Sequence, residues 1–395
     1  MKHIHPFPAR MAPEIALSKL SSLKKGQKVL DPMAGSGMVL STAARVGIES
    51  IGVDLDPLAV LISGVASTKI DIDEVYNGLK LLLGKLSDFP EEQVILPWID
   101  SDSETKDFIQ FWFDEKQTKQ LRLLSYFLIA NPIPLKKEVI NVLLTAISRL
   151  IITKEPKASL ARDTAHSRPH RVISHNDYDI IESLPKSVDH IIGVFNSAKI
   201  IKNSVTFSGD ARNLFFINDN DIDVIITSPP YLNALDYMRG HKLSLVWLGY
   251  SISMLRDIRS ISIGAEKTNG NLLNNDFGNI LRELELWENQ STTTLMIQRY
   301  FLDLCKQLLE SYRVLKPKGI ASYVIGNSEI KGRFIPNNEL LKRAAYQAGF
   351  ELINEEQREI PDSRRYLPIS GDHIKSLSKR MRTENIVTFR KPLLH

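Results

Sequence analysis

The stretch that decides the fold is QKVLDPMAGSGMVLSTAARVGIESIGVDLDPLAVLISGVAS, residues 27–67. QKVLD and SIGVD are typical of short buried strands, and each ends in an acid. GMVLSTAARVG has the apolar spacing of a helix that closes at Gly47, and PLAVLISGVAS begins a second helix with proline in its first position. Strand, glycine turn, helix, strand and helix in this order predict the first half of a doubly wound α/β sheet.

The pattern of apolar residues changes twice along the remaining chain. LLLGKL, FIQFWF and VINVLLTAISRLII have helical spacing and few strand signals accompany them, so residues 69–202 are expected to form a mostly helical insertion. From residue 203 strands return in SVTFSGD, DIDVIITS and GIASYVIGNS, and FELINEEQREI with ENIVTFRK predicts a closing hairpin pair. The expected organisation is a first part of the core at 1–68, the insertion, and a second part of the core at 203–395.

The overall composition limits the classes of protein that the chain can belong to. It has 395 residues, of which 43% are hydrophobic and 24% are charged, which is ordinary for a globular protein. No apolar run reaches the ~18–20 residues of a membrane span, and the N-terminal MKHIHPFPARMAPE does not resemble a signal peptide. A single cysteine, Cys305, allows no intrachain disulfide. We therefore expect a cytoplasmic protein without a membrane partner, and the net charge of +4 permits an anionic one.

Acids and glycines at the predicted strand ends indicate a ligand site. In DPMAGSG, residues 31–37, Gly35 and Gly37 would let the backbone approach a ligand at a helix N-terminus. Asp54 ends the next strand and could accept both hydroxyl hydrogens of a ribose. Asp210, in SGDAR, could receive the amino group of an adenine. The full G-x-G-x-x-G spacing is missing, which disfavours a dinucleotide.

The segment TSPPY, residues 227–231, follows the apolar strand DVIIT. Two successive prolines make a rigid loop at the carboxyl end of a parallel strand, where such sheets bind ligands. An aromatic amine is a poor nucleophile because its lone pair is delocalised into the ring. Ser228 Oγ and the Pro229 carbonyl could accept hydrogen bonds that favour a pyramidal nitrogen, and Tyr231 could stack on the base. The simpler alternative is a proline-rich turn that ends a strand.

These segments resemble the DNA amino-methyltransferases. TSPPY resembles their catalytic loop in the form associated with cytosine N4, and DPMAGSG resembles their motif I, with Met33 and Met38 where phenylalanine and threonine are more usual. HPFPARM and SGDAR resemble their motifs X and III. The motif order is that of the alpha class, whose insertion is the target recognition domain. The resemblance covers residues 3–60 and 205–330 and is weak in the insertion.

The resemblance implies an α/β fold: a Rossmann-like class I S-adenosylmethionine-dependent methyltransferase core with a mostly helical inserted domain. It implies S-adenosyl-L-methionine as cofactor, double-stranded DNA as partner, and a prokaryotic, nucleoid-associated location, and it allows a cognate restriction endonuclease. The catalytic residues that it implies are Ser228, Pro229, Pro230 and Tyr231. The cofactor-binding residues are Phe7, Pro8, Ala9, Asp31, Pro32, Ala34, Gly35, Gly37, Asp54, Asp210, Ala211 and Thr227.

Two basic tracts are candidates for DNA contact. Residues 154–171, KEPKASLARDTAHSRPHR, show no apolar periodicity. Their side chains suit contacts to phosphates and base edges, so we favour DNA contact over the alternative of a solvated linker. The second tract, residues 359–382, is equally compatible with a charged surface helix. No histidine has a carboxylate or cysteine partner at metal-ligand spacing, so we expect no metal. The candidate DNA-binding residues are Lys154, Lys157, Arg162, His166, Arg168, His170, Arg171, Arg364 and Arg365.

The sequence therefore predicts a site-specific DNA methyltransferase that acts on the exocyclic amine of a flipped base, with cytosine N4 as the best match, in a restriction-modification or related DNA-marking role. An N6-adenine DNA methyltransferase is the first alternative. An RNA base methyltransferase and a catalytically silent DNA-binding subunit also remain open. A C5-cytosine enzyme is disfavoured, because that reaction needs a cysteine nucleophile and Cys305 lies within a predicted helix.

Overall fold

The computed structural model describes residues 3–7, 11–87, 89–197, 199–232, 236–264, 275–286, 291–330, 332–360 and 383–393. Its centre is a seven-stranded sheet with the order β10-β11-β7-β6-β1-β2-β5. Among these strands β11 alone runs in the direction opposite to the others. The strands are β1 (Lys28–Asp31), β2 (Glu49–Asp54), β5 (Val205–Ser208), β6 (Ile222–Thr227), β7 (Leu315–Ile325), β10 (Glu351–Glu359) and β11 (Thr383–Arg390). The antiparallel pairing of β10 with β11 confirms the predicted closing pair.

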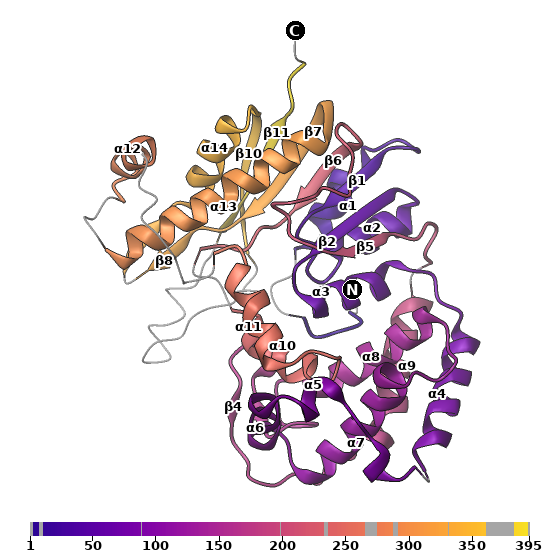
Figure 1. The fold of residues 1–395 in the computed structure, drawn as a ribbon. Coiled ribbons are helices and arrows are strands. Elements are labelled where there is room, and N and C mark those ends of the chain that lie inside the picture. The colour runs from indigo at the N-terminus through magenta and orange to yellow at the C-terminus, as the bar shows by residue number, and fades with distance from the viewer. Residues whose placement is uncertain are drawn as a thin grey trace.

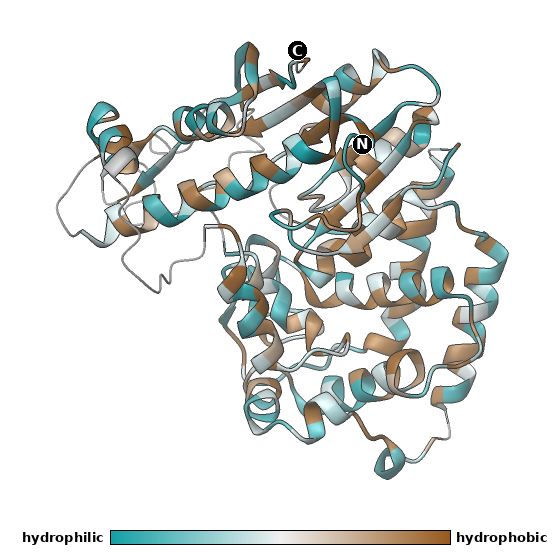
Figure 2. Ribbon diagram, turned by 45° about the horizontal axis from the view of Figure 1, so that its top comes forward, coloured by the Kyte–Doolittle hydropathy of each residue, from teal (hydrophilic) through white to brown (hydrophobic). Residues whose placement is uncertain are grey.

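Helices cover both faces of this sheet because its strands are apolar on both sides. Neighbouring residues such as Val29 and Leu30 of β1 belong to different buried clusters, as do Val224 and Ile225 of β6. Figure 2 shows the central strands as largely hydrophobic. One face carries α1 (Pro13–Ser21), α2 (Met38–Val46) and α3 (Pro57–Ser67), and the other carries α13 (Thr292–Val314) and α14 (Asn337–Gln347). This arrangement confirms the predicted doubly wound core.

A helical lobe lies beside the sheet domain (Figure 1). It begins after α3, which packs against both the sheet and the lobe. Its elements are α4 (Ile72–Leu86), a 3-10 turn η1 (Glu91–Gln93), α5 (Pro97–Asp100), α6 (Ser103–Trp112), α7 (Glu115–Ser125), a π-helical turn η2 (Tyr126–Ala130), α8 (Lys137–Ile151) and α9 (Ile180–Asn196). The mostly helical character predicted for this part of the chain is confirmed.

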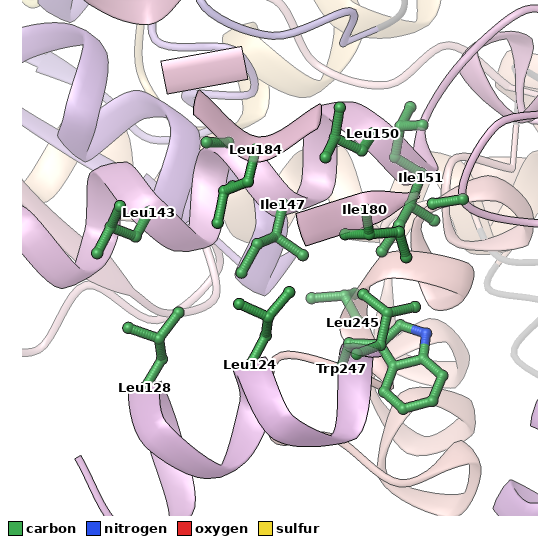
Figure 3. Packing of buried hydrophobic residues seen from close by; sticks show 14 of the residues in the cluster. Leu124, Leu128, Leu143, Ile147, Leu150, Ile151, Ile180, Leu184, Leu245 and Trp247 are labelled. Atoms are coloured by element: carbon green, nitrogen blue, oxygen red, sulfur yellow. The ribbon is translucent and has the colours of Figure 1, made fainter. Parts of the chain in front are cut away.

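Two helices from later in the chain complete this lobe. α10 (Met238–Leu245) and α11 (Ile252–Ile261) follow the TSPPY segment and pack with the lobe. Figure 3 shows Leu245 and Trp247 meeting Leu124 and Ile180 in one apolar core. The chain therefore leaves the sheet at β6, enters the lobe, and returns to the sheet through α13.

Smaller elements complete the described chain. Within the basic tract at 154–171 the strands β3 (Ala161–Arg162) and β4 (His170–Arg171) pair around a 3-10 turn η3 (Thr164–His166). A further short pair consists of β8 (Ser328–Ile330) and β9 (Arg333–Ile335), and α12 spans Asn275–Glu283. Among the residues that the structure describes, no helix is long and apolar enough to cross a membrane.

Candidate active site

The glycine loop after β1 turns directly into α2. Gly37 has φ of +75° and is the N-cap of that helix. A Cβ at Gly37 would lie 2.6 Å from Ser63 Cα, so α3 approaches the loop too closely for any side chain. The free N–H groups at the start of α2 therefore lie at the carboxyl end of β1, as an anion- or ligand-binding turn requires.

The carboxylate of Asp54 is tied to this loop from the neighbouring strand. Its Oδ2 accepts a hydrogen bond from Gly35 N at 2.7 Å, and its Oδ1 accepts one from Asp56 N at 2.9 Å. Burial, together with the charge of Asp56, raises the pKa of Asp54 to about 6. Asp54 therefore lies at the position predicted for a ribose-binding acid, and its charge is poorly compensated.

Asp31 connects the glycine loop with the TSPPY segment, which is called the catalytic loop below after the role predicted for it. Thr227 Oγ1 donates to Asp31 Oδ1 at 2.7 Å, and Met33 N donates to the same oxygen at 3.2 Å. Burial raises the pKa of Asp31 to about 7, against the lowering effect of these hydrogen bonds. The loops that follow β1 and β6 are thereby fixed next to each other, as the pairing of these strands requires.

The catalytic loop leaves β6 with Ser228 half-buried and Pro229 buried. Ser228 Oγ donates a hydrogen bond to the carbonyl oxygen of Val324 on β7 at 3.0 Å. A hydroxyl that gives its hydrogen to a carbonyl keeps its lone pairs for a further donor, and its acceptor strength rises. Burial, followed by the charge of Glu384, raises the pKa of the Tyr231 phenol well above its ordinary value.

The N-terminal segment lies against both parts of the site. The Phe7 ring is 3.7 Å from the position of a Cβ on Gly35, and its centroid is 4.9 Å from that of His241 and 6.0 Å from that of Tyr237. Phe7 is buried. It therefore lies over the glycine loop, where motif X is expected to close on a cofactor, while Pro8 and Ala9 lie outside the described residues.

Asp210 follows β5 at the same edge of the sheet. Gly209 N donates to Asp54 O at 3.0 Å, which holds this turn beside β2. Both oxygens of Asp210 accept hydrogen bonds from Arg212, and Arg212 Nη1 also reaches Asp303 Oδ1 at 2.5 Å. Burial opposes ionisation of Asp210, but Arg212 outweighs it and holds the pKa of Asp210 below its ordinary value. The adjacent Ala211 is buried.

The structure thus brings most of the predicted cofactor and catalytic residues to one edge of the sheet. Asp31 ends β1 and is followed by Pro32, Ala34, Gly35 and Gly37; Asp54 ends β2; Asp210 and Ala211 follow β5; and Thr227 ends β6 and is followed by Ser228 to Tyr231. These are the carboxyl ends of adjacent parallel strands, which is where open α/β sheets bind ligands.

The basic tract at 154–171 is held against α10. Thr153 N donates to the buried Thr164 Oγ1 at 2.7 Å. A Cβ at Gly240 of α10 would lie 2.5 Å from the Thr164 carbonyl oxygen, so the tract and the helix after the catalytic loop are in close backbone contact. The tract is therefore an ordered part of the lobe, built around β3 and β4.

The cations of this tract differ in exposure and partners. Lys154, Lys157, Arg162, His170 and Arg171 are exposed, and His166 and Arg168 are half-buried. Arg162 pairs with Glu155 at 3.2 Å, and the Arg171 guanidinium lies 5.4 Å from the centroid of Phe111. Arg364 and Arg365 of the second tract lie outside the described residues. In the described ranges no cluster of three or more histidine, cysteine or acidic residues could hold a metal ion.

Three charged partners in the site were not predicted from the sequence. Arg212 pairs with Asp210 and also with Asp303, and Asp56 contacts His241. Asp303 and His241 come from α13 and α10, far along the chain from their partners. Asp56 could have been recognised as a helix cap, because it directly precedes the proline that starts α3. Its side chain accepts a hydrogen bond from Leu58 N.

The strand order, with the candidate site at the carboxyl ends of its parallel strands, defines a Rossmann-like α/β core. No protein-family model matches the chain. The chain is 24% identical over 399 residues to the Type II methyltransferase M.BsoBI of Geobacillus stearothermophilus, a match that covers 84% of this chain and 74% of that protein. It is 22% identical over 395 residues to the Type II methyltransferase M.MvaI of Kocuria varians, covering 91% and 84%.

A Thermus thermophilus protein, described as a putative DNA modification methylase and solved with S-adenosyl-L-methionine, matches 47% of this chain and 55% of its own. Its TM-score of 0.25 and identity of 16% are too low to bear on function. The similarity to Type II methyltransferases, by contrast, extends over most of the chain.

Proposed function

We propose that this protein is an S-adenosylmethionine-dependent DNA methyltransferase that transfers a methyl group to the exocyclic amine of a flipped base, and that this base is cytosine, methylated at N4. The observation that carries the proposal is the contact between the two loops: Thr227, which begins the catalytic loop, is hydrogen-bonded at 2.7 Å to Asp31, which begins the glycine loop. A methyl donor on one loop and an amine on the other would therefore be neighbours.

The residues that follow β1, β2 and β5 suit S-adenosyl-L-methionine. The backbone at Gly35 and Gly37 allows close approach, Asp54 offers oxygens to two ribose hydroxyls, and Phe7 covers the loop. Asp210 would accept the adenine amino group in place of one of the four hydrogen bonds that its oxygens accept from Arg212. The bound cofactor would supply an electrophilic methyl group on its sulfonium.

The catalytic loop suits an amine acceptor of that methyl group. Ser228 donates its hydrogen to Val324 O, so the lone pairs of its oxygen can accept an amine hydrogen and favour a pyramidal nitrogen. The Pro229 carbonyl would accept the second hydrogen, and Pro230 would keep the loop rigid. Tyr231 would stack on the base. Positioning for in-line transfer accounts for the rest of the rate enhancement.

Double-stranded DNA is the proposed substrate, and the helical lobe at 69–202 is the proposed target recognition domain. The cations of the basic tract lie in the lobe beside α10, from where they could hold phosphates near the catalytic loop. The Type II methyltransferases M.BsoBI and M.MvaI support a restriction-modification role. The serine that opens the SPPY loop supports cytosine N4 over adenine N6.

Transfer of tritium from methyl-labelled S-adenosylmethionine tests the proposal. The purified protein is incubated with unmethylated plasmid DNA and, in parallel, with total RNA. We expect label in the DNA, none in the RNA, and none in either with the Ser228→Ala variant. Label in RNA alone would indicate an RNA base methyltransferase. Binding of S-adenosylhomocysteine without any transfer would indicate a catalytically silent subunit.

A further inference from the structure

A buried histidine joins the helix after the catalytic loop to the cofactor side of the site. His241 on α10 is fully buried, and its Nδ1 lies 2.5 Å from Asp56 Oδ2. Within the described chain the Nε2 atom of His241 has no hydrogen-bond partner, so Asp56 makes the polar contact that holds the ring. A buried imidazole and a half-buried carboxylate at this distance form a strong, directed hydrogen bond.

Asp56 uses its two oxygens for separate purposes. Oδ1 caps α3 by accepting from Leu58 N at 2.9 Å, and Oδ2 meets His241. The backbone N–H of Asp56 donates to Asp54 Oδ1 at 2.9 Å, so the position of Asp56 determines one of the two hydrogen bonds that orient Asp54. A displacement of Asp56 would therefore turn the proposed ribose-binding carboxylate.

The imidazole of His241 also packs against Phe7, the residue that covers the glycine loop. Its ring centroid lies 4.9 Å from that of Phe7 and 6.1 Å from that of Tyr237. Phe7 in turn lies over Gly35. His241 thus contacts two parts of the proposed cofactor site: Asp56, which is next to the ribose-binding acid Asp54, and Phe7, which lies over the glycine loop.

The same helix is anchored in the lobe. Ser244 of α10 donates to Ser148 of α8 at 2.7 Å, and His5 Nε2 lies 2.9 Å from the same Ser148 oxygen. Arg149 Nη1 donates to the Ile4 carbonyl at 2.8 Å. The N-terminal segment that carries Phe7 is therefore fastened to the lobe and α10, and the hydrogen bond between His241 and Asp56 joins this assembly to the acid side of the site.

We propose that His241 is a positioning residue for the methyl donor: through Asp56 and Phe7 it fixes the ribose-binding acid and the cover of the site relative to the helical lobe. The inference rests on the proposed function, because it assigns the cofactor to this site. The contact also connects the lobe to Asp54, since the backbone N–H of Asp56 is hydrogen-bonded to that acid.

A double-mutant cycle tests the inference by calorimetry with S-adenosylhomocysteine. Asp56→Ser keeps a helix-capping hydroxyl but cannot reach His241, and His241→Leu removes the imidazole. We expect each variant to weaken binding by about tenfold or more, since one strong hydrogen bond is lost. The double variant should bind no worse than either single one. His241→Asn, whose amide nitrogen replaces Nδ1, should restore most of the affinity.

Circular dichroism at the assay temperature establishes that each variant is folded, and the single-turnover rate at saturating cofactor gives a second readout. A purely structural role predicts lower melting temperatures with unchanged affinity and rate in the folded variants. That result, or losses that add in the double variant, overturns the inference while leaving the proposed function intact. Wild-type protein that fails to bind S-adenosylhomocysteine overturns both.

Discussion

Replacing Asp54 with asparagine separates the effect of its charge on the unfolding free energy from its proposed role in binding the ribose. Its pKa of about 6, raised by burial and Asp56 from 3.8, means that ionisation of Asp54 costs the folded protein about 3 kcal/mol at neutral pH. Asparagine removes this cost. It keeps one acceptor oxygen, so one of the N–H groups of Gly35 and Asp56 loses its partner, at about 1–3 kcal/mol. The two effects oppose each other and are similar in size.

We therefore expect Asp54→Asn to change the unfolding free energy of the cofactor-free protein by less than about 2 kcal/mol. Binding of S-adenosylhomocysteine should weaken by at least about tenfold, because charge-assisted hydrogen bonds to the ribose hydroxyls are worth about 1.5–3 kcal/mol. Urea unfolding and calorimetry on the same preparations measure both. Glu49→Gln, at the opposite end of β2, is the matched control and should bind as the wild type does.

The pH dependence follows with a defined sign. The folded-state pKa of Asp54 lies above the unfolded value, so the destabilisation by its charge is present above about pH 6 and disappears as the pH falls towards 3.8. Ribose binding needs the charged form, so the affinity of the wild type should fall below about pH 6, and the difference from Asp54→Asn should vanish there. The charge of Asp54 also helps to raise the pKa of Asp31, which is about 7, so Asp31 should titrate at a lower pH in Asp54→Asn than in the wild type. Unchanged affinity in Asp54→Asn, with a large loss of stability, would refute the ribose assignment.

Three further predictions concern the loops and the lobe. Ser228→Ala should slow single-turnover methyl transfer about a hundredfold or more, with cofactor and DNA affinities near those of the wild type, and a wild-type rate in this variant would exclude Ser228 from the mechanism. Tyr231→Ala should also reduce the fluorescence of 2-aminopurine placed at the flipped position. Arg168→Gln with Arg171→Gln should make the slope of log K against log salt shallower by about one for each phosphate that is no longer bound, and an unchanged slope and affinity would remove the tract from the DNA interface. Gly37→Ala should lower the unfolding free energy by about 1–3 kcal/mol more than Gly26→Ala, because both have positive φ but only Gly37 meets a neighbour at 2.6 Å; equal losses would contradict the packing argument.

The core of the fold could be predicted because its signals are local. Strand β1, the glycine turn and α2 occupy consecutive residues, and proline at the start of α3 and glycine after α2 mark helix ends. Asp31 and Asp54 end two strands and Asp210 follows a third, and the parallel pairing of those strands brings the three acids to one edge. Prediction of these positions needed only the assumption of a doubly wound sheet.

The remaining contacts depend on pairings that chain order does not reveal. The place of Asp210 after a strand could be predicted, but the ion pair of its neighbour Arg212 with Asp303 depends on the position of α13. The packing of α10 and α11 in the helical lobe follows from the burial of Trp247 among residues of α7 and α8, more than 90 positions earlier. The contact between His241 and Asp56 spans 185 residues, and neither residue carries a local motif that names its partner.

The identity of the methylated nucleoside tests the central claim most directly. Unmethylated plasmid DNA is incubated with the purified protein and S-adenosylmethionine carrying a deuterated methyl group, then digested to nucleosides and analysed by mass spectrometry. The proposal predicts deuterated N4-methyl-2′-deoxycytidine, absent when Ser228→Ala replaces the wild type. Deuterium in N6-methyl-2′-deoxyadenosine would contradict the target base, and no labelled nucleoside from a protein that binds S-adenosylhomocysteine would contradict DNA methylation itself.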